Sequence, residues 1–187
     1  MININKLKKA SKTCVFIRHG EKDINNYNLT DRGKHEIFEF SNSLCLLDKK
    51  IIIYSSPESR CIETATIINN VVNGENSDLH VSDVLGKPGI QVKNEIEYTK
   101  LTDTMKCREI FKEWKKGMHY DAMNRPEIIK TKIIDFFEKT SSKNEITIYI
   151  GQSGTVACTG YSLSLVDYQA NNEDWVNFLD GYILRLP

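Results

Sequence analysis

Short apolar runs alternate with longer amphipathic stretches along the whole chain. The short runs are rich in β-branched and aromatic residues, and they predict strands at about 13–18, 51–55, 79–83, 146–151 and 181–186. Between them, apolar residues recur at helical spacing and predict helices at about 31–47, 57–72, 103–116, 126–139 and 154–165. This alternation predicts the α/β class, with a doubly wound, mostly parallel sheet flanked by helices on both faces.

The first apolar run ends abruptly in Arg18, His19 and Gly20. In a parallel sheet the carboxyl ends of the strands meet at one edge, and ligands bind there. A guanidinium can bind two phosphate oxygens in a fork, and a neutral imidazole beside it can attack phosphorus. Gly20 would let the backbone approach a ligand. An ordinary polar loop can have the same pattern, so this segment alone does not establish a phosphate-binding site.

Two further joints between a strand and a helix carry polar residues. After the second strand, Ser56 is expected to cap a helix that begins at Pro57, with Arg60 one turn further on. The N–H groups of such a helix start can bind an anion beside Arg60. After the fourth strand the chain reads Gly151, Gln152, Ser153, Gly154, Thr155. All three joints lie at the expected ligand-binding edge of the sheet.

These motifs, in this order and spacing, resemble the histidine phosphatase superfamily, which includes the cofactor-dependent phosphoglycerate mutases and many small phosphatases. The residues that carry the resemblance are Arg18-His19-Gly20-Glu21, Leu29-Thr30-Asp31-Arg32-Gly33, Ser55-Ser56-Pro57, Arg60 and Glu63-Thr64-Ala65. The resemblance implies a phosphoglycerate mutase-like fold. It further implies that His19 becomes phosphorylated and that Arg18 and Arg60 bind the phosphoryl group. Asn25 matches, less closely, an asparagine of the family's phosphate pocket.

The chain departs from the family at the second catalytic histidine, whose place is taken by Gln152, followed by Ser153. A histidine there can carry a positive charge, whereas an amide donates a weaker, neutral hydrogen bond to the phosphoryl oxygens. We therefore expect phosphate binding to survive better than turnover. Three interpretations stay open: a phosphatase with weakened catalysis, a non-catalytic protein that binds a phosphorylated ligand, and a glutamine introduced to trap a ligand. A mutase is disfavoured, because retransfer of the phosphoryl group needs both histidines.

The acid that protonates the leaving group is the least defined part of the predicted site. In one branch of the family a glutamate from an insert serves, and Glu95 and Glu97 lie in the corresponding part of this chain, within a segment from 86 to about 102 expected to cover the pocket. Nothing in the local sequence selects one of the two glutamates. His119 is a further candidate. The catalytic residues predicted are therefore His19 with Glu95 or Glu97, and the phosphate ligands are Arg18, Arg60, Asn25, Gln152 and Ser153.

Composition narrows the classes of partner. Among 187 residues, 25 basic and 25 acidic side chains leave no net charge, which gives no electrostatic reason to expect nucleic acid or an anionic membrane. The expected partner is a phosphorylated small molecule, nucleotide or phosphoprotein. We expect no cofactor and no metal. A serine hydrolase is disfavoured, because no histidine follows Ser153.

The length and the apolar runs bear on organisation and location. A chain of 187 residues suits a single domain over 1–187, and it contains no repeat or linker. The five cysteines form no C-x-x-C pair and are expected to be reduced. No run is long enough to cross a bilayer, and the first residues lack the apolar segment of a signal peptide. These features predict a cytoplasmic protein.

Overall fold

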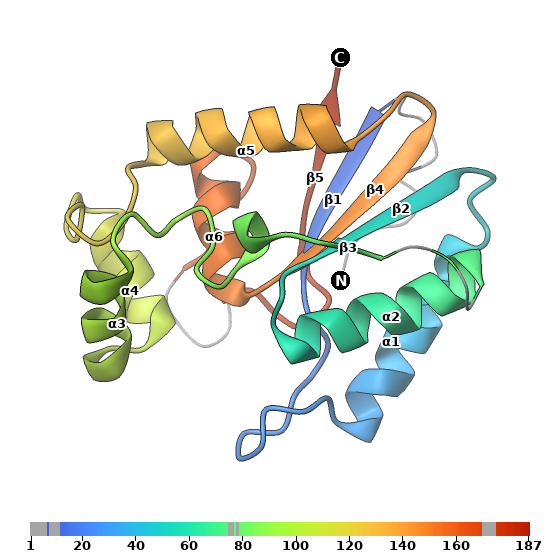
Figure 1. The fold of residues 1–187 in the computed structure, drawn as a ribbon, viewed down its shortest axis with the longest axis horizontal. Helices are drawn as coiled ribbons and strands as arrows, with labels where there is room; N and C mark the ends of the chain where they lie inside the picture. The colour runs from blue at the N-terminus through green and yellow to red at the C-terminus, as the bar shows by residue number, and fades with distance from the viewer. Residues whose placement is uncertain (1–6, 8–11, 75–76, 78, 170–174) are drawn as a thin grey trace.

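The computed structural model describes residues 7, 12–74, 77, 79–169 and 175–187, and it places five strands in one sheet with the order β3-β2-β4-β1-β5 (Figure 1). The strands are β1 (Lys12–Arg18), β2 (Lys50–Ser55), β3 (His80–Val81), β4 (Glu145–Gly151) and β5 (Gly181–Leu186). The pairs β1–β4, β4–β2 and β2–β3 are parallel, and β5 runs antiparallel to β1 at the edge. The predicted α/β class, with its mostly parallel sheet, is confirmed.

Helices cover both faces of this sheet, and alternate residues of β1 show how. Val15 and Ile17 face the core beneath α1 (Asp31–Leu44) and α2 (Ser59–Asn73). Cys14 and Phe16 face the opposite core. That core packs against α4 (Cys107–Trp114), α5 (Pro126–Thr140) and α6 (Ser153–Ser162). Because side chains alternate along a strand, a central strand buried on both faces needs apolar residues throughout, as the sequence of β1 has.

The start of α2 differs from the sequence prediction. The helix begins at Ser59 and its N-cap is Glu58, whereas the sequence predicted Ser56 as the cap and Pro57 as the first helical residue. The reason is that Ser56 still belongs to the sheet edge. Its backbone N–H donates to Ile150 O at 2.9 Å, so the chain can turn into the helix only after Pro57. Ser56 Oγ donates to Gly86 O at 3.4 Å and accepts a hydrogen bond from the Glu58 N–H at 3.4 Å.

The segment between β3 and α5 contains two helices where one was predicted. The expected helix 103–116 is α4, and before it comes α3 (Glu95–Thr104), which begins inside the segment expected to be an insert. The Asn94 side chain accepts hydrogen bonds from Ile96 N and Glu97 N and so caps α3. Extended backbone at Met105 and Lys106 separates the two helices. The strand predicted at 79–83 is also shorter, because a one-turn 3₁₀ helix begins at Asp83.

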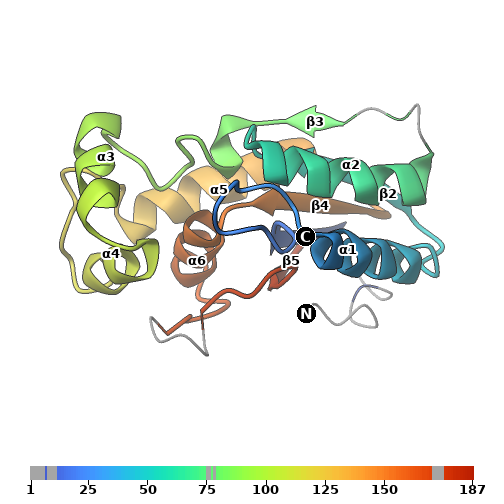
Figure 2. The same ribbon diagram turned by 90° about the horizontal axis from the view of Figure 1, so that it is seen from below.

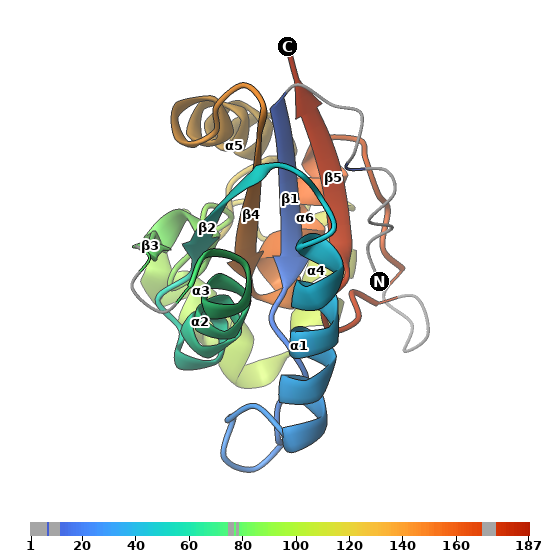
Figure 3. The ribbon, with the colours of Figure 1, turned by 90° about the vertical axis from the view of Figure 1, so that its right-hand side faces the viewer.

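The carboxyl ends of the parallel strands form one edge of the molecule, which is seen from below in Figure 2. The loop after β1 lies there, between α6 and α1. It projects beyond the ends of the strands (Figures 1 and 3). Within the part of the chain that the structure describes, no helix has the length and apolar character needed to cross a membrane.

Candidate phosphate-binding site

The end of β1 is held on both sides by its neighbouring strands. The Arg18 N–H donates to Asp180 O at 2.9 Å, just before β5. The His19 N–H donates to Gly151 O at 3.1 Å, at the end of β4. The pairing of Arg18 with Gly151 makes Gln152 the residue next to His19 at the sheet edge. The sheet therefore brings Arg18, His19 and Gln152 together at one edge.

The hydrogen bonds of His19 fix which ring nitrogen carries the proton. Nδ1 lies 2.7 Å from the carbonyl oxygen of Gly20, which can only accept, so Nδ1 carries the proton. Nε2 receives a hydrogen bond from Arg60 Nε at 3.1 Å. A guanidinium can only donate, so Nε2 presents its lone pair toward Arg60. In this tautomer Nε2 is the ring nitrogen with the basic lone pair, and that lone pair faces Arg60.

Burial keeps this imidazole neutral. His19 is 2 % exposed, and desolvation lowers its pKa from 6.5 to about 3. The hydrogen bond to Gly20 O opposes this shift, and the positive charges of Arg18, Arg60 and Lys22 add to it. Near neutral pH His19 is therefore in its neutral form, which is the form of an imidazole that can act as a nucleophile.

The lowered pKa of His19 has a consequence for stability. Between pH 6.5 and about 3 the unfolded chain binds a proton on this residue and the folded chain does not. The free energy of unfolding therefore falls as the pH falls through this window, by at most about 1.4 kcal/mol per pH unit from this group. We expect His19→Asn to flatten that dependence in urea titrations from pH 7.5 to 4.5. Parallel profiles for the wild type and the variant would contradict the buried neutral histidine.

Arg18 is oriented by the segment that precedes β5. Its Nη1 donates to Val176 O at 2.6 Å, and its guanidinium carbon lies 4.0 Å from the centre of the Phe178 ring. Burial lowers the pKa of Arg18 to about 10, which leaves the side chain charged at neutral pH. Its Nε is buried and has no hydrogen-bond partner among the described residues. A buried donor of this kind is costly unless an acceptor, such as an anion, satisfies it.

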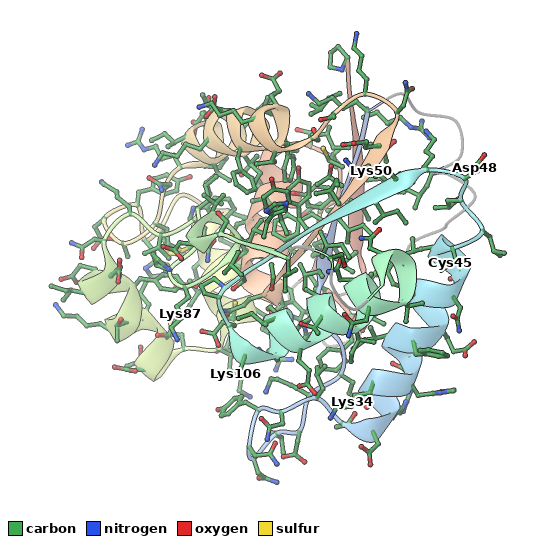
Figure 4. The ribbon with its side chains drawn as sticks, turned by 45° about the vertical axis from the view of Figure 1, so that its right-hand side comes forward. Lys34, Cys45, Asp48, Lys50, Lys87 and Lys106 are labelled. Carbon is green, nitrogen blue, oxygen red and sulfur yellow. The ribbon has the colours of Figure 1, made fainter. Side chains whose placement is uncertain are left out.

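Arg60 reaches the same point from the first turn of α2. Its Nη1 donates to Glu58 Oε2 at 2.9 Å, while its Nε points to His19. Figure 4 labels Lys87, whose Nζ lies 3.9 Å from the other carboxylate oxygen of Glu58. Glu58 is therefore shared between two cations. Arg60 keeps unbalanced positive charge beside the imidazole.

Gln152 and Ser153 open α6 next to His19. Gln152 is the N-cap, but its side chain makes no capping hydrogen bond. The Gln152 amide lies near Gly86, where a Cβ would stand 3.4 Å from Nε2. Ser153 hydrogen-bonds the Cys107 thiol, which lies close enough to Arg18 for each to affect the other's pKa. Two arginines and a neutral histidine thus gather at this sheet edge, and Gln152 adds a neutral amide that lies against Gly86.

The structure places the remaining predicted residues outside this cluster. Asn25 lies in an exposed turn, where its N–H donates to Asp23 Oδ1 at 2.7 Å. Glu95 and Glu97 occupy the first turn of α3, and Glu97 pairs with Lys100 at 2.7 Å. Figure 2 shows α3 beside α4, at the end of the molecule away from α1. The role of Asn25 as a phosphate ligand and that of Glu95 or Glu97 as the acid stay predictions.

His119, the outside candidate for the acid, bonds Glu113 through Nε2 at 2.6 Å. Gly20 also has a packing reason that the sequence did not suggest. A Cβ at Gly20 would lie 2.5 Å from Ile37 Cδ1, so the glycine lets α1 pack closely against the end of β1. The approach of a ligand to this backbone stays a prediction.

Three residues near His19 and the two arginines were not predicted from the sequence: Lys22, Glu58 and Phe178. Glu58 had a detectable signal, because it lies two residues before Arg60 at a helix start. No sequence pattern pointed to Phe178, since only the pairing of β5 with β1 brings its ring to Arg18. Lys22 follows the first motif, but a loop lysine is common and gave no reason to be singled out.

Comparisons with known proteins bear on the family and on the fold of the chain. Residues 14–87 match the model of the histidine phosphatase superfamily (branch 1). No curated protein sequence matches that of the chain. Gln152 lies outside the matched residues, so the family model does not test the substitution.

Solved structures share the fold at low sequence identity. A phosphoglycerate mutase from Bacillus anthracis has a TM-score of 0.54 at 14 % identity, over 84 % of this chain and 82 % of that one. A mycobacterial glucosyl-3-phosphoglycerate phosphatase has a TM-score of 0.54 at 13 % identity, over 82 % and 79 %. A phosphoserine phosphatase from Entamoeba histolytica, in complex with phosphoserine, has a TM-score of 0.52 at 16 % identity, over 81 % and 79 %. The predicted fold and the resemblance are confirmed.

Proposed function

We propose that this chain, histidine phosphatase-like in residues 14–87 and phosphoglycerate mutase-like in fold, binds a phosphate monoester and hydrolyses it slowly through a phosphohistidine at His19. The family match and the phosphatase neighbours support a phosphatase-type protein at this coarse level. The observation that carries the finer proposal is the tautomer of His19. Its Nε2 lone pair faces the donor that would hold the phosphoryl group.

The proposed reaction has two displacements. Nε2 of His19 attacks phosphorus, the bond from phosphorus to the ester oxygen breaks, and that oxygen leaves with a proton. Water then attacks the phosphohistidine, the P–N bond breaks, and inorganic phosphate and the neutral imidazole are released. Arg18 and Arg60 balance the charge on the phosphoryl oxygens throughout. The proposed donor of the leaving-group proton is either Glu95 or Glu97, which the sequence left as alternatives.

Gln152 is the reason for proposing slow turnover. At the sheet edge beside His19 it offers a neutral amide where a second histidine would offer a charged donor. Loss of one such donor typically costs about 100- to 1000-fold in rate. The same substitution favours a second candidate function, a non-catalytic protein that recognises a phosphorylated ligand. In that case Arg18 and Arg60 bind the phosphate of the ligand, and His19 serves only to accept the hydrogen bond from Arg60.

Anion binding tests the site that both functions require. We expect vanadate or inorganic phosphate to bind between Arg18, Arg60 and His19, and we expect Arg60→Gln or Arg18→Gln to weaken binding about 10- to 100-fold, the worth of a charged hydrogen bond. Isothermal titration calorimetry measures this. Arg32→Gln is the matched control, because Arg32 is exposed and pairs with Glu36 on α1. Equal binding by the wild type and both pocket variants would refute the site.

A further inference from the structure

A groove lies between α5 and the segment that follows β3. We define this segment, residues 83–92, as the strap, which Figure 1 shows passing from β3 toward α3. The groove has a volume of about 510 Å³, within the range of sites that bind small molecules. Its lining includes none of Arg18, His19 and Arg60, so it is separate from the phosphate-binding cluster.

The wall formed by α5 comes from one stripe of the helix. Four residues line the groove at the spacing i, i+3, i+4, i+7, namely Lys132, Asp135, Phe136 and Lys139, and this spacing puts them on one face. The Phe136 ring packs edge-on against Tyr54 of β2, with the ring centres 6.0 Å apart, which fixes its position on the sheet. The helix therefore offers the groove an aromatic ring flanked by charged groups.

The strap that forms the other wall is held at both ends. Next to β3, the Ser82 N–H donates to Ser55 O at 2.8 Å. At the far end the buried Asn124 side chain donates through Nδ2 to Ile90 O at 2.9 Å and to Val92 O at 3.2 Å. Asn124 lies just before the start of α5, so it ties the strap to the helical wall. The groove is therefore formed without a ligand, which lowers the entropic cost of binding one.

The two walls carry opposite unbalanced charges. On α5, Lys139 and Asp135 pair with each other at 2.7 Å. Within the part of the chain that the structure describes, the Lys132 ammonium and the Asp83 carboxylate form no ion pair or hydrogen bond. One positive charge on the helix and one negative charge on the strap thus face the groove unpaired. A complementary ligand carries one charge of each sign.

We propose that this groove binds a small apolar zwitterion, either a free amino acid or a short peptide with an apolar side chain. The carboxylate pairs with Lys132 and the ammonium with Asp83. The apolar side chain packs on Val84, Ile90 and Phe136, whose burial is favourable. A ligand with only a carboxylate would leave Asp83 unbalanced, and one with only an ammonium would leave Lys132 unbalanced. The site is additional to the proposed function and does not depend on it.

Methyl NMR on the full chain, labelled at isoleucine and valine, locates the binding. The probes are L-phenylalanine and the dipeptide of phenylalanine and leucine, and the tighter of the two identifies the source as an amino acid or a peptide. We expect it to shift the methyl signals of Val84, Ile90 and Val92 to saturation. The Ile37 Cδ1 methyl lies against Gly20 at the end of β1, so it reports on the phosphate-binding residues and should not shift.

Blocked forms of the tighter probe test the two ion pairs separately. Acetylation removes the ammonium and amidation removes the carboxylate, and each should weaken binding about 2- to 5-fold, the worth of one partly exposed ion pair. In Lys132→Gln the free probe and its amide should bind equally, while the acetylated form still binds more weakly. In Asp83→Asn the free and acetylated forms should bind equally, while the amide still binds more weakly.

Lys130→Gln is the matched control, because Lys130 is exposed on α5 but does not line the groove. It should keep every difference seen in the wild type. The absence of saturable shifts at the groove methyl groups would overturn the proposal, as would shifts confined to Ile37, which would place the probe at the phosphate-binding residues. Equal binding of the free and blocked forms by the wild type would show that the groove does not recognise the two charges, which also overturns it.

Discussion

His19→Ala is expected to abolish phosphoryl transfer, lowering the hydrolysis of p-nitrophenyl phosphate by about 1000-fold or more, because the variant lacks the nucleophile. In the structure the Nε2 lone pair accepts a hydrogen bond from Arg60, and burial keeps the ring neutral. The wild type should also form a phosphorylated intermediate that is labile in acid and stable in base, as a phosphoramidate is. Rapid quenching with labelled substrate detects it.

Exposed His35, on the surface of α1, provides the control for this experiment. His35→Ala should keep the wild-type rate and the wild-type labelling. Full activity in His19→Ala would show that the nucleophile assignment is wrong. Loss of labelling together with loss of anion binding would indicate damage to the pocket, so vanadate affinity is measured on the same preparation.

Gln152→His is expected to raise the rate about 10- to 1000-fold, because it returns a positive donor to the place where negative charge develops in the transition state. The residue follows the strand that pairs with β1, so its side chain starts next to His19. Gly86 lies against the amide and has no Cβ to obstruct a ring. Stability should change little, since both side chains are polar and this position makes no capping bond.

Gln152→Asn is the matched control, because it keeps a neutral amide and should give no gain. Steady-state kinetics of the three forms on one aryl phosphate decide between the two candidate functions. An unchanged rate in Gln152→His, with anion binding intact, would contradict a weakened enzyme and support a protein that binds phosphorylated ligands without turning them over.

The strands and the floor of the site could be predicted from the sequence because both depend on local patterns. A run such as Cys14–Ile17 is apolar at every position, which only a strand buried on both faces requires. The parallel topology then places the residues after each strand at one edge, so Arg18, His19 and Gln152 had to converge.

What could not be predicted depends on contacts between distant segments. The N-cap of α2 moved to Glu58 because the Ser56 N–H is taken by Ile150, a bond that exists only in the assembled sheet. The contact of Phe178 with Arg18 has the same origin. Helix α3 was missed for a different reason: none of its residues is buried, so it lacks the apolar stripe by which helices are recognised.

The contact between Arg18 and the segment before β5 also fixes when the pocket can form during synthesis. The guanidinium is oriented by Val176 and Phe178, and the backbone of Arg18 bonds Asp180 and Leu179. The motif at residues 18–21 leaves the ribosome early, yet these partners emerge more than 150 positions later. A nascent chain therefore carries Arg18 and His19 without the partners that orient the Arg18 side chain until residues 175–186 have been made.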